Sequence, residues 1–180
     1  MDPIDSYVVV KAHIFHQMQI RDISMKCLPI TYDSMSMFNL LIQNCSYIVC
    51  VDKIVAGYIL CDDTGVICSF AVLPEYRKKG IGALLINAAS KHYSELKLKE
   101  TWLHVHVNNN VAINFYKKMG FTVLKTVENY YDCFKDTNDA YRMVLKLEPV
   151  LETPELEPAL KTLDETILKS KPKSDHVATL

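Results

Sequence analysis

The sequence predicts one mixed α/β domain over residues 1–147 and a separate tail over residues 148–180. Three observations lead to this prediction. Short runs rich in Val, Ile and Tyr alternate with longer stretches in which apolar residues recur at helical spacing. A hydrophobic share of 49% and a charged share of 23% are typical of a globular chain. All five glycines and every Phe, Tyr and Trp precede residue 148, so only the first part can bury a large core.

The first elements are a strand and two helices. We expect the strand over residues 7–10 and an amphipathic helix over residues 12–28. Pro29 ends this helix because the residue before a proline avoids helical backbone angles. Asp33 or Ser34 is placed to cap a second helix that runs to about residue 43.

The rest of the domain predicts six more strands and two more helices. The strands are expected at residues 46–51, 54–61, 66–73, 101–107, 121–127 and 140–147, and the helices at residues 81–96 and 110–119. Asp52-Lys53 forms a two-residue hairpin turn, and Gly120 closes the last helix. The order is therefore strand, two helices, three strands, helix, strand, helix and two strands.

Composition excludes several classes of protein. The net charge of −1 disfavours a strongly basic nucleic-acid binder. No run of 18 apolar residues is long enough for a membrane span, and the first five residues lack the basic start of a secretory signal. The six cysteines form no C-x-x-C pair, and most lie in apolar runs. We therefore expect reduced thiols in a cytosolic protein, with no nucleic-acid or membrane partner.

The acidic tail differs from the domain in composition. It contains four of the seven prolines and no glycine or aromatic residue. Leu156, Leu160, Leu163 and Ile167 recur at helical spacing, which suits packing on a partner helix. The alternatives for the tail are a disordered segment and a partner-binding one.

The segment from Val72 to Ala83 carries the most specific pattern. A strand ends, three basic residues follow, and two glycines open a helix. N–H groups at a helix N-terminus bind anions, and glycine lets the backbone approach a phosphate closely. The pattern lacks the Gly-Lys-Ser/Thr of a P-loop and the third glycine of a Rossmann fingerprint. The residues expected to form a pyrophosphate cradle are Val72, Arg77, Lys78, Lys79, Gly80, Ile81, Gly82 and Ala83.

The stretch Arg77-Lys78-Lys79-Gly80-Ile81-Gly82 resembles the Arg/Gln-x-x-Gly-x-Gly/Ala motif of the GCN5-related N-acetyltransferases, the GNAT family. In that family the turn binds the pyrophosphate of acetyl-CoA. The expected order of elements over about residues 5–147 is also similar to the GNAT fold. The resemblance implies an α+β domain with a central mixed, twisted β-sheet, helices on both faces, and acetyl-CoA as the cofactor. No metal is expected, since the sequence has no ligand cluster.

A second segment strengthens the resemblance. Asn109 and the following Ala112, Phe115 and Tyr116 are similar to the family's segment that lines the pantetheine arm. The resemblance implies that Asn109 contacts the cofactor and that Tyr116 protonates the departing thiolate. From the residues alone, Asn109 could equally be a helix N-cap, and Tyr116 a core aromatic.

Three further segments narrow the resemblance to the N-terminal acetyltransferases, particularly the NatE type (N-alpha-acetyltransferase 50). They are Leu28-Pro29-Ile30-Thr31-Tyr32, Leu103-His104-Val105 and Asn129-Tyr130-Tyr131. The resemblance implies a pocket for the first residues of a protein, formed by Leu28, Pro29, Ile30, Tyr32, Tyr130 and Tyr131. The alternatives are that Leu-Pro only ends a helix and that the tyrosines only pack.

The acceptor amine must be neutral when it attacks. An α-amino group has a pKa of about 7.7–8.0, so a weak base is sufficient. The resemblance implies that His104 is this base, and imidazole titrates in the required range. Counting back from Gly82, the family's catalytic tyrosine falls on Val66, which cannot transfer a proton.

The leading expectation is therefore an N-terminal protein acetyltransferase that acts on Met-starting, Met-Leu-like N-termini. The resemblance implies association with NatA-type subunits and a cytoplasmic location, and it leaves the nucleus open. The alternatives are a lysine or small-molecule acetyltransferase and a weakly active scaffold subunit of a NatA/NatE-like complex. The residue that motivates the scaffold alternative is Val66.

Overall fold

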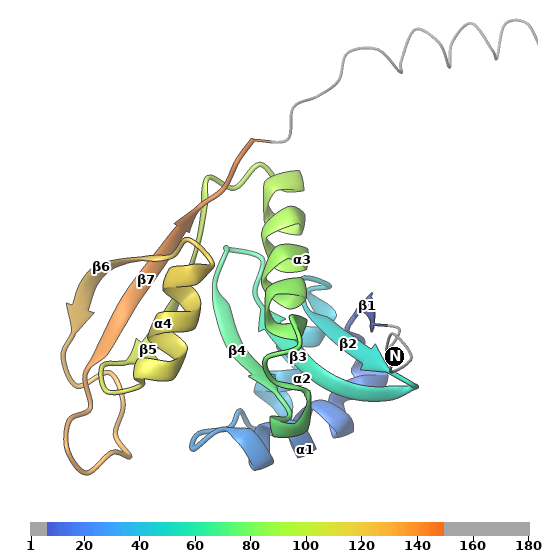
Figure 1. Cartoon of the computed structure of the whole chain (residues 1–180), viewed down its shortest axis with the longest axis horizontal. Helices are drawn as coiled ribbons and strands as arrows, with labels where there is room; N and C mark the ends of the chain where they lie inside the picture. Colours follow the sequence, from blue (N-terminus) through green and yellow to red (C-terminus); the bar gives the residue numbers. More distant parts are fainter. Residues whose placement is uncertain (1–6, 150–180) are drawn as a thin grey trace, which may run out of the picture. The chain divides into compact units, whose positions relative to one another are not determined.

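Seven strands and four α-helices follow one another in the order that the sequence predicts (Figure 1). The computed structural model describes residues 7–149, so the predicted tail from residue 150 onward, with its leucine spacing, lies outside the described residues. The strands are β1 (Tyr7–Lys11), β2 (Tyr47–Val51), β3 (Ile54–Cys61), β4 (Ile67–Val72), β5 (Glu100–His106), β6 (Thr122–Val127) and β7 (Ala140–Lys146). The helices are α1 (Gln17–Cys27), α2 (Ser34–Ile42), α3 (Ile81–Glu95) and α4 (Asn110–Lys118), with short 3₁₀ turns η1 (Ile14–His16) and η2 (Pro74–Tyr76).

The first helix begins later than the apolar spacing predicts. Ala12 still belongs to the sheet region, because its N–H donates to the carbonyl of Ser46 (2.9 Å). His13 has extended backbone angles, and its N–H donates to Nδ1 of His16 (3.0 Å), which holds η1 ahead of α1. For the second helix Asp33 is the cap, since its carboxylate accepts from the N–H groups of Met35 and Ser36.

The strands form two antiparallel sheets joined by one parallel bridge. The first sheet has the order β1-β2-β3-β4 and the second the order β5-β7-β6. They meet at an isolated parallel bridge between Val66, just before β4, and Trp102 in β5. Beyond that bridge the two strands diverge, as Figure 1 shows. The predicted mixed sheet thus owes its parallel component to this bridge.

Helices cover both faces of the first sheet, as expected. Side chains of β3 alternate between the two faces, with Tyr58 and Leu60 in one apolar cluster and Ile59 in the other. The first cluster includes Ile20 of α1, and the second includes Leu85 of α3. β4 pairs antiparallel with β3, and its end leads into the segment that was predicted to form the cradle.

β4 is the last strand of the first sheet, so the backbone N–H and C=O groups on its edge away from β3 make no hydrogen bonds to another strand of that sheet. Leu73 donates its N–H to the carbonyl of Ala56, which lies in β3 (2.9 Å). Because the backbone groups of successive strand residues point to alternate sides, those of Val72 point to the opposite edge. The carbonyl of Val72 there accepts a hydrogen bond from Nε of Arg77 (2.9 Å).

Among residues 7–149, no helix combines the length and apolar character needed to cross a bilayer. Nor do these residues bring together three or more His, Cys, Asp or Glu side chains as a metal site. All six cysteines, which fall within this range, are free thiols.

Candidate active site

The predicted cradle lies between the end of β4 and the start of α3. Lys78 and Gly80 both adopt left-handed backbone angles, with φ of 61° and 85°. These two residues turn the chain so that α3 begins at Ile81, with Gly80 as its N-cap. The first N–H groups of a helix have no partner within the helix, so this N-terminus can receive an anion.

The three basic residues of the cradle have different surroundings. Arg77 is tied to the strand end through its bond to the Val72 carbonyl, and its own N–H donates to the carbonyl of Pro74 (3.2 Å). The ammonium of Lys79 lies 5.5 Å from the ring centre of Tyr76. Lys78 is exposed beside them. Arg77 therefore shapes the loop, while Lys78 and Lys79 add positive charge around it.

The two glycines of the cradle are needed for different reasons. Gly80 is in the left-handed region, where a Cβ would meet no atom within 4 Å but the backbone would be strained. A Cβ on Gly82 would lie 3.0 Å from Cζ of Phe115 and 3.2 Å from Cζ of Phe70. Gly82 therefore permits the close packing of α3 against these two rings, which stack at 5.5 Å.

Asn109 is the N-cap of α4. Its Oδ1 accepts a hydrogen bond from the N–H of Ala112 (3.1 Å), and the rest of the residue is exposed. The capping role, which the sequence left as an alternative, is therefore observed. A contact between Asn109 and the cofactor stays a prediction.

Tyr116 lies in a group of aromatic rings that joins the two sheets. Its ring centre is 6.1 Å from Phe70 of β4, 5.5 Å from Phe115 and 5.6 Å from Phe121. Burial raises the pKa of Tyr116 well above its usual value, and the nearby Tyr131 raises it further. The hydroxyl therefore stays protonated at neutral pH, which suits a proton donor.

His104 lies on β5 under the loop between β6 and β7. Its ring centre is 4.0 Å from that of Tyr130 and 5.3 Å from that of Trp102. Burial lowers the pKa of His104 below its usual value, and the cations Arg142 and Lys125 lower it further. The imidazole is therefore neutral near pH 7 and can accept a proton.

His106 has a structural role. Its Nδ1 accepts from the N–H of Asn108 (3.2 Å), so Nε2 carries the proton and donates to the carbonyl of Thr137 (2.7 Å). The ring also lies 4.0 Å from that of Phe134. These contacts anchor the loop that bears Tyr130.

Tyr32, Tyr130 and Tyr131 converge from two loops far apart in the sequence. Burial raises the pKa of Tyr32 to about 12, and the neighbouring Cys68 and Tyr130 add to the shift. The ring centres of Tyr130 and Tyr131 are 4.9 Å apart, edge to face. These tyrosines and Cys68 form what we call the tyrosine cluster, at the start of β4.

Cys68 reaches this cluster because of a bulge. The pairing of β3 with β4 passes from Leu60–Ser69 to Cys61–Ile67, so Cys68 is the extra residue. A bulge turns a side chain out of the regular alternation and often lies beside an active site. Nothing in the sequence assigns a role to Cys68.

The remaining pocket residues follow α1. Leu28 is half-buried and packs against the cluster that holds α1 and α2. Pro29 and Ile30 are exposed, Ile30 by 42%. Tyr32, further along this loop, is the residue that the structure brings to the tyrosine cluster.

Val66 is held where the two sheets meet. Its N–H donates to the carboxylate of Asp62 (2.8 Å), and its carbonyl accepts from the hydroxyl of Tyr93 (3.1 Å). It also makes the parallel bridge to Trp102. Val66 therefore has a defined backbone role, while its side chain offers no group for proton transfer.

Sequence reasoning missed Arg142 and Lys125. Arg142 of β7 pairs directly opposite His104, and Lys125 of β6 pairs opposite Arg142. The sequence predicts the strands that contain Lys125 and Arg142. It does not predict which residues they pair with, because strand register depends on tertiary structure. Both residues lie outside the short motifs that carried the family resemblance.

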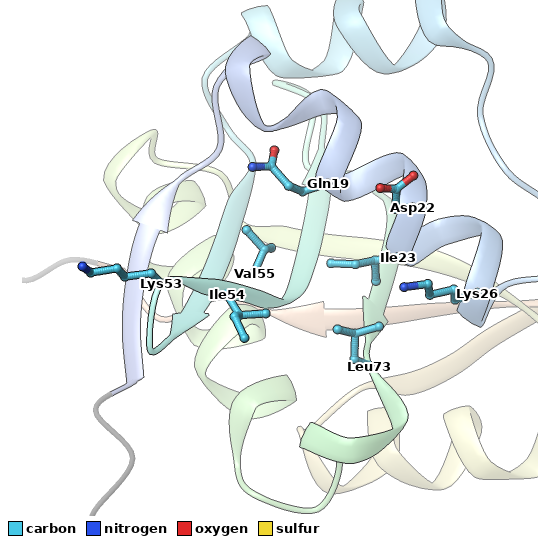
Figure 2. Close-up of a pocket in the computed structure, with 8 residues that line it drawn as sticks. All are labelled: Gln19, Asp22, Ile23, Lys26, Lys53, Ile54, Val55 and Leu73. Atoms are coloured by element: carbon cyan, nitrogen blue, oxygen red, sulfur yellow. The ribbon is translucent and has the colours of Figure 1, made fainter.

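Two surface hollows lie away from these groups. One, of about 260 Å³, lies between α1 and the β2–β3 hairpin, with Lys26 and Lys53 at opposite ends (Figure 2). Ile23 and Leu73 also line it. The other, of about 290 Å³, lies beside Phe38 of α2. None of the predicted site residues lines either hollow.

Comparison with known proteins agrees with this arrangement. The profile of the Acetyltransferase (GNAT) family matches residues 18–121, more than half of the chain. The chain belongs to the GNAT family. The match includes the cradle, His104 and Tyr116, so the resemblance carried by the cradle motif is confirmed.

Several GNAT proteins with known names or structures are similar to this chain. It is 43% identical to an N-alpha-acetyltransferase of Sulfurisphaera tokodaii over 84 residues, which are 46% of this chain and 48% of that protein. It is 41% identical to the probable N-acetyltransferase san of Drosophila melanogaster over 69 residues, 36% of each chain. The chain thus spans about half or less of the length of these relatives.

Solved structures extend the similarity over the whole fold. Arabidopsis thaliana Naa50, in complex with the bisubstrate analogue CoA-Ac-MVNAL, superposes with a TM-score of 0.70 at 28% identity, covering 77% of this chain and 97% of that one. Ard1 from Thermoplasma volcanium superposes with a TM-score of 0.72 at 24% identity, covering 79% and 98%. The GNAT fold is therefore confirmed.

Proposed function

We propose that this GNAT protein is an N-terminal acetyltransferase, which transfers acetyl from acetyl-CoA to the α-amine of Met-starting proteins. The observation that carries the proposal is that β4 connects the cradle at one end to the tyrosine cluster at the other. The last residue of the strand, Val72, belongs to the cradle, while Cys68 belongs to the tyrosine cluster, in which Tyr130 lies beside His104. Cys68 and Val72 are four residue steps apart along the strand, which is roughly 13 Å. A long cofactor could therefore be held at one end and react at the other.

The residues of the cradle fit acetyl-CoA. A helix N-terminus, a left-handed glycine and exposed basic side chains suit a pyrophosphate. The whole expected set is Val72, Arg77, Lys78, Lys79, Gly80, Ile81, Gly82, Ala83 and Asn109. Support comes from the Naa50 relative, whose bound analogue contains a CoA moiety. When bound, acetyl-CoA supplies a thioester that an amine can attack directly.

Two side chains of the protein, His104 and Tyr116, would accept and donate the protons that the reaction moves. His104, neutral because burial and two cations lower its pKa, accepts the proton of the acceptor amine. Tyr116 holds a proton for the departing sulfur. The N–H of Val72, on the edge of β4 away from β3, can donate to the part of the cofactor held at the cradle end of the strand.

The acceptor's first side chain would lie between the loop after α1 and the tyrosine cluster. We assign this pocket to Leu28, Pro29, Ile30, Tyr32, Tyr130 and Tyr131. Burying a methionine side chain there contributes about 1.5–3 kcal/mol, which is sufficient to select an apolar first residue. The Naa50 analogue carries a peptide that begins with methionine, which supports this assignment. The proposal includes NatA-type subunits as partners and a cytoplasmic location.

Three peptides test the proposal. The purified protein is incubated with labelled acetyl-CoA and a Met-Leu peptide, the same peptide with a blocked N-terminus and an internal lysine, or a Ser-starting peptide. We expect transfer to the first alone. Transfer to the blocked peptide would instead assign lysine acetylation, and equal transfer to the Ser peptide would contradict the apolar pocket.

The pH dependence should report the lowered pKa of His104. Protonated imidazole cannot accept a proton, so kcat/KM is expected to fall as the pH drops through this pKa. An NMR titration of the His104 ring should give a midpoint below the usual 6.5. The His104→Ala variant assigns the signal. A midpoint above 6.5 would contradict the account, because the base would then be largely protonated near neutral pH.

A weakly active scaffold subunit is the second candidate, and Val66 is the observation that favours it. Its side chain cannot replace the proton-transfer group expected at this position. A Val66→Tyr variant that gains at least about tenfold in turnover would support the scaffold alternative. High turnover by the wild-type protein would exclude it.

A further inference from the structure

The side chain of Arg142 is held beside His104 without a hydrogen-bond partner at one buried atom. Its guanidinium carbon lies 4.0 Å from the ring centre of Trp102. Its Nε is buried and makes no hydrogen bond within residues 7–149. Buried donors are nearly always satisfied, so this atom shows that the domain does not use all the hydrogen-bonding groups of Arg142.

Positive charge is concentrated on this face of the second sheet. Lys125 pairs opposite Arg142, and both cations act on His104. Glu100 is the nearby carboxylate on β5; Lys146 donates to it at 2.7 Å and is the main cause of its lowered pKa, to which Arg142 adds. Arg142 therefore lies beside a second cation and an imidazole, while the nearby carboxylate already has a cation of its own.

We propose that Arg142 binds a side-chain carboxylate of the acceptor. N-termini that carry Asp or Glu shortly after the first residue are then preferred. This inference rests on the proposed function, because the acceptor must lie next to His104. The acceptor would then be recognised at two places. The apolar pocket selects its first residue, and Arg142 selects a following residue by its negative charge.

The geometry suits a carboxylate. Guanidinium presents its N–H groups in a planar fork that matches two carboxylate oxygens, and stacking on an aromatic ring fixes that plane. Trp102 supplies the ring on the same strand as His104. The cradle has its own cations at the other end of β4, so the phosphates of the cofactor do not require Arg142.

Matched peptides test the inference in the wild-type protein. Met-starting peptides carry Glu at the second, third or fourth position and are compared with the same peptides carrying Gln. Dissociation constants are measured by calorimetry in the presence of CoA, and acetyl transfer is measured in parallel. At one position or more, we expect the Glu peptide to bind at least about tenfold more tightly, the effect of a hydrogen bond to a charged group.

Substitutions distinguish a direct contact between Arg142 and the peptide carboxylate from attraction by the overall positive charge of this face. Arg142→Gln should bring the Glu/Gln ratio close to one, whereas Lys125→Gln should leave most of it. Lys91→Gln, on the exposed side of α3, is the matched control and should leave the ratio unchanged. Circular dichroism checks that each variant folds.

Equal binding of the Glu and Gln peptides by the wild-type protein would overturn the inference. So would a ratio that survives Arg142→Gln, or one that Lys125→Gln removes equally. A clear ratio without any acetyl transfer would support carboxylate recognition while contradicting the proposed function. The two failures are therefore distinguishable.

Discussion

Replacing His104 by alanine is expected to lower kcat/KM for a Met-Leu peptide by about 100-fold or more. General-base catalysis contributes about 10²–10⁴ to a rate, and the neighbouring imidazole of His106 is not placed to substitute, because both of its nitrogens are hydrogen-bonded. Steady-state kinetics at saturating acetyl-CoA measure the effect. The dissociation constant for acetyl-CoA should stay within about twofold, since His104 is remote from the cradle.

His92→Ala is the matched control for this prediction. His92 lies on α3 and contacts the ring of Tyr47, away from the tyrosine cluster. This variant should retain wild-type kcat/KM. If His104→Ala also retained it, His104 would not be the base, and the proton would have to leave the amine through another group.

Gly82→Val is expected to have the second large effect. The new side chain must displace Phe115 and Phe70, because its Cβ would lie 3.0 and 3.2 Å from their ring atoms. Overpacking of this kind lowers the free energy of unfolding by about 1–3 kcal/mol. Because the first turn of α3 shifts with it, affinity for acetyl-CoA should fall at least about tenfold. Denaturant unfolding and calorimetry measure the two effects.

Gly80→Ala provides the contrast. A Cβ there meets nothing within 4 Å, so the cost is the left-handed backbone alone, about 1–2 kcal/mol of stability. The stacking of Phe70 on Phe115 should survive. Wild-type affinity for acetyl-CoA in Gly82→Val would show that packing at this glycine does not support the cradle.

Local patterns predicted nearly all of the fold. The cap at Asp33 and the hairpin at Asp52-Lys53, where both residues have positive φ, depend on near neighbours and were predictable. The late start of α1 was not, because it depends on the bond from Ala12 to Ser46 of another segment. The division into two sheets was not predictable either, because β4 and β5 pair only at the bridge between Val66 and Trp102, which are far apart in the sequence.

The site was predictable where motifs are continuous in sequence. The cradle segment lies between β4 and α3, and Tyr130 and Tyr131 lie between β6 and β7, as the predicted order of elements implies. Their binding roles stay predictions. The position of Cys68 depends on a bulge in the pairing of β3 with β4, which leaves no local trace in the sequence. The position of Arg142 beside His104 depends on the register of β5 against β7, which tertiary packing sets.

The central claim is that the acetyl group goes to an α-amine. The most direct measurement is tandem mass spectrometry of one Met-Leu peptide that has both a free N-terminus and an internal lysine, after reaction with acetyl-CoA. The account predicts that fragment ions place acetyl on the first residue and leave the lysine unmodified. Acetyl on the lysine, with a free N-terminus, would contradict it.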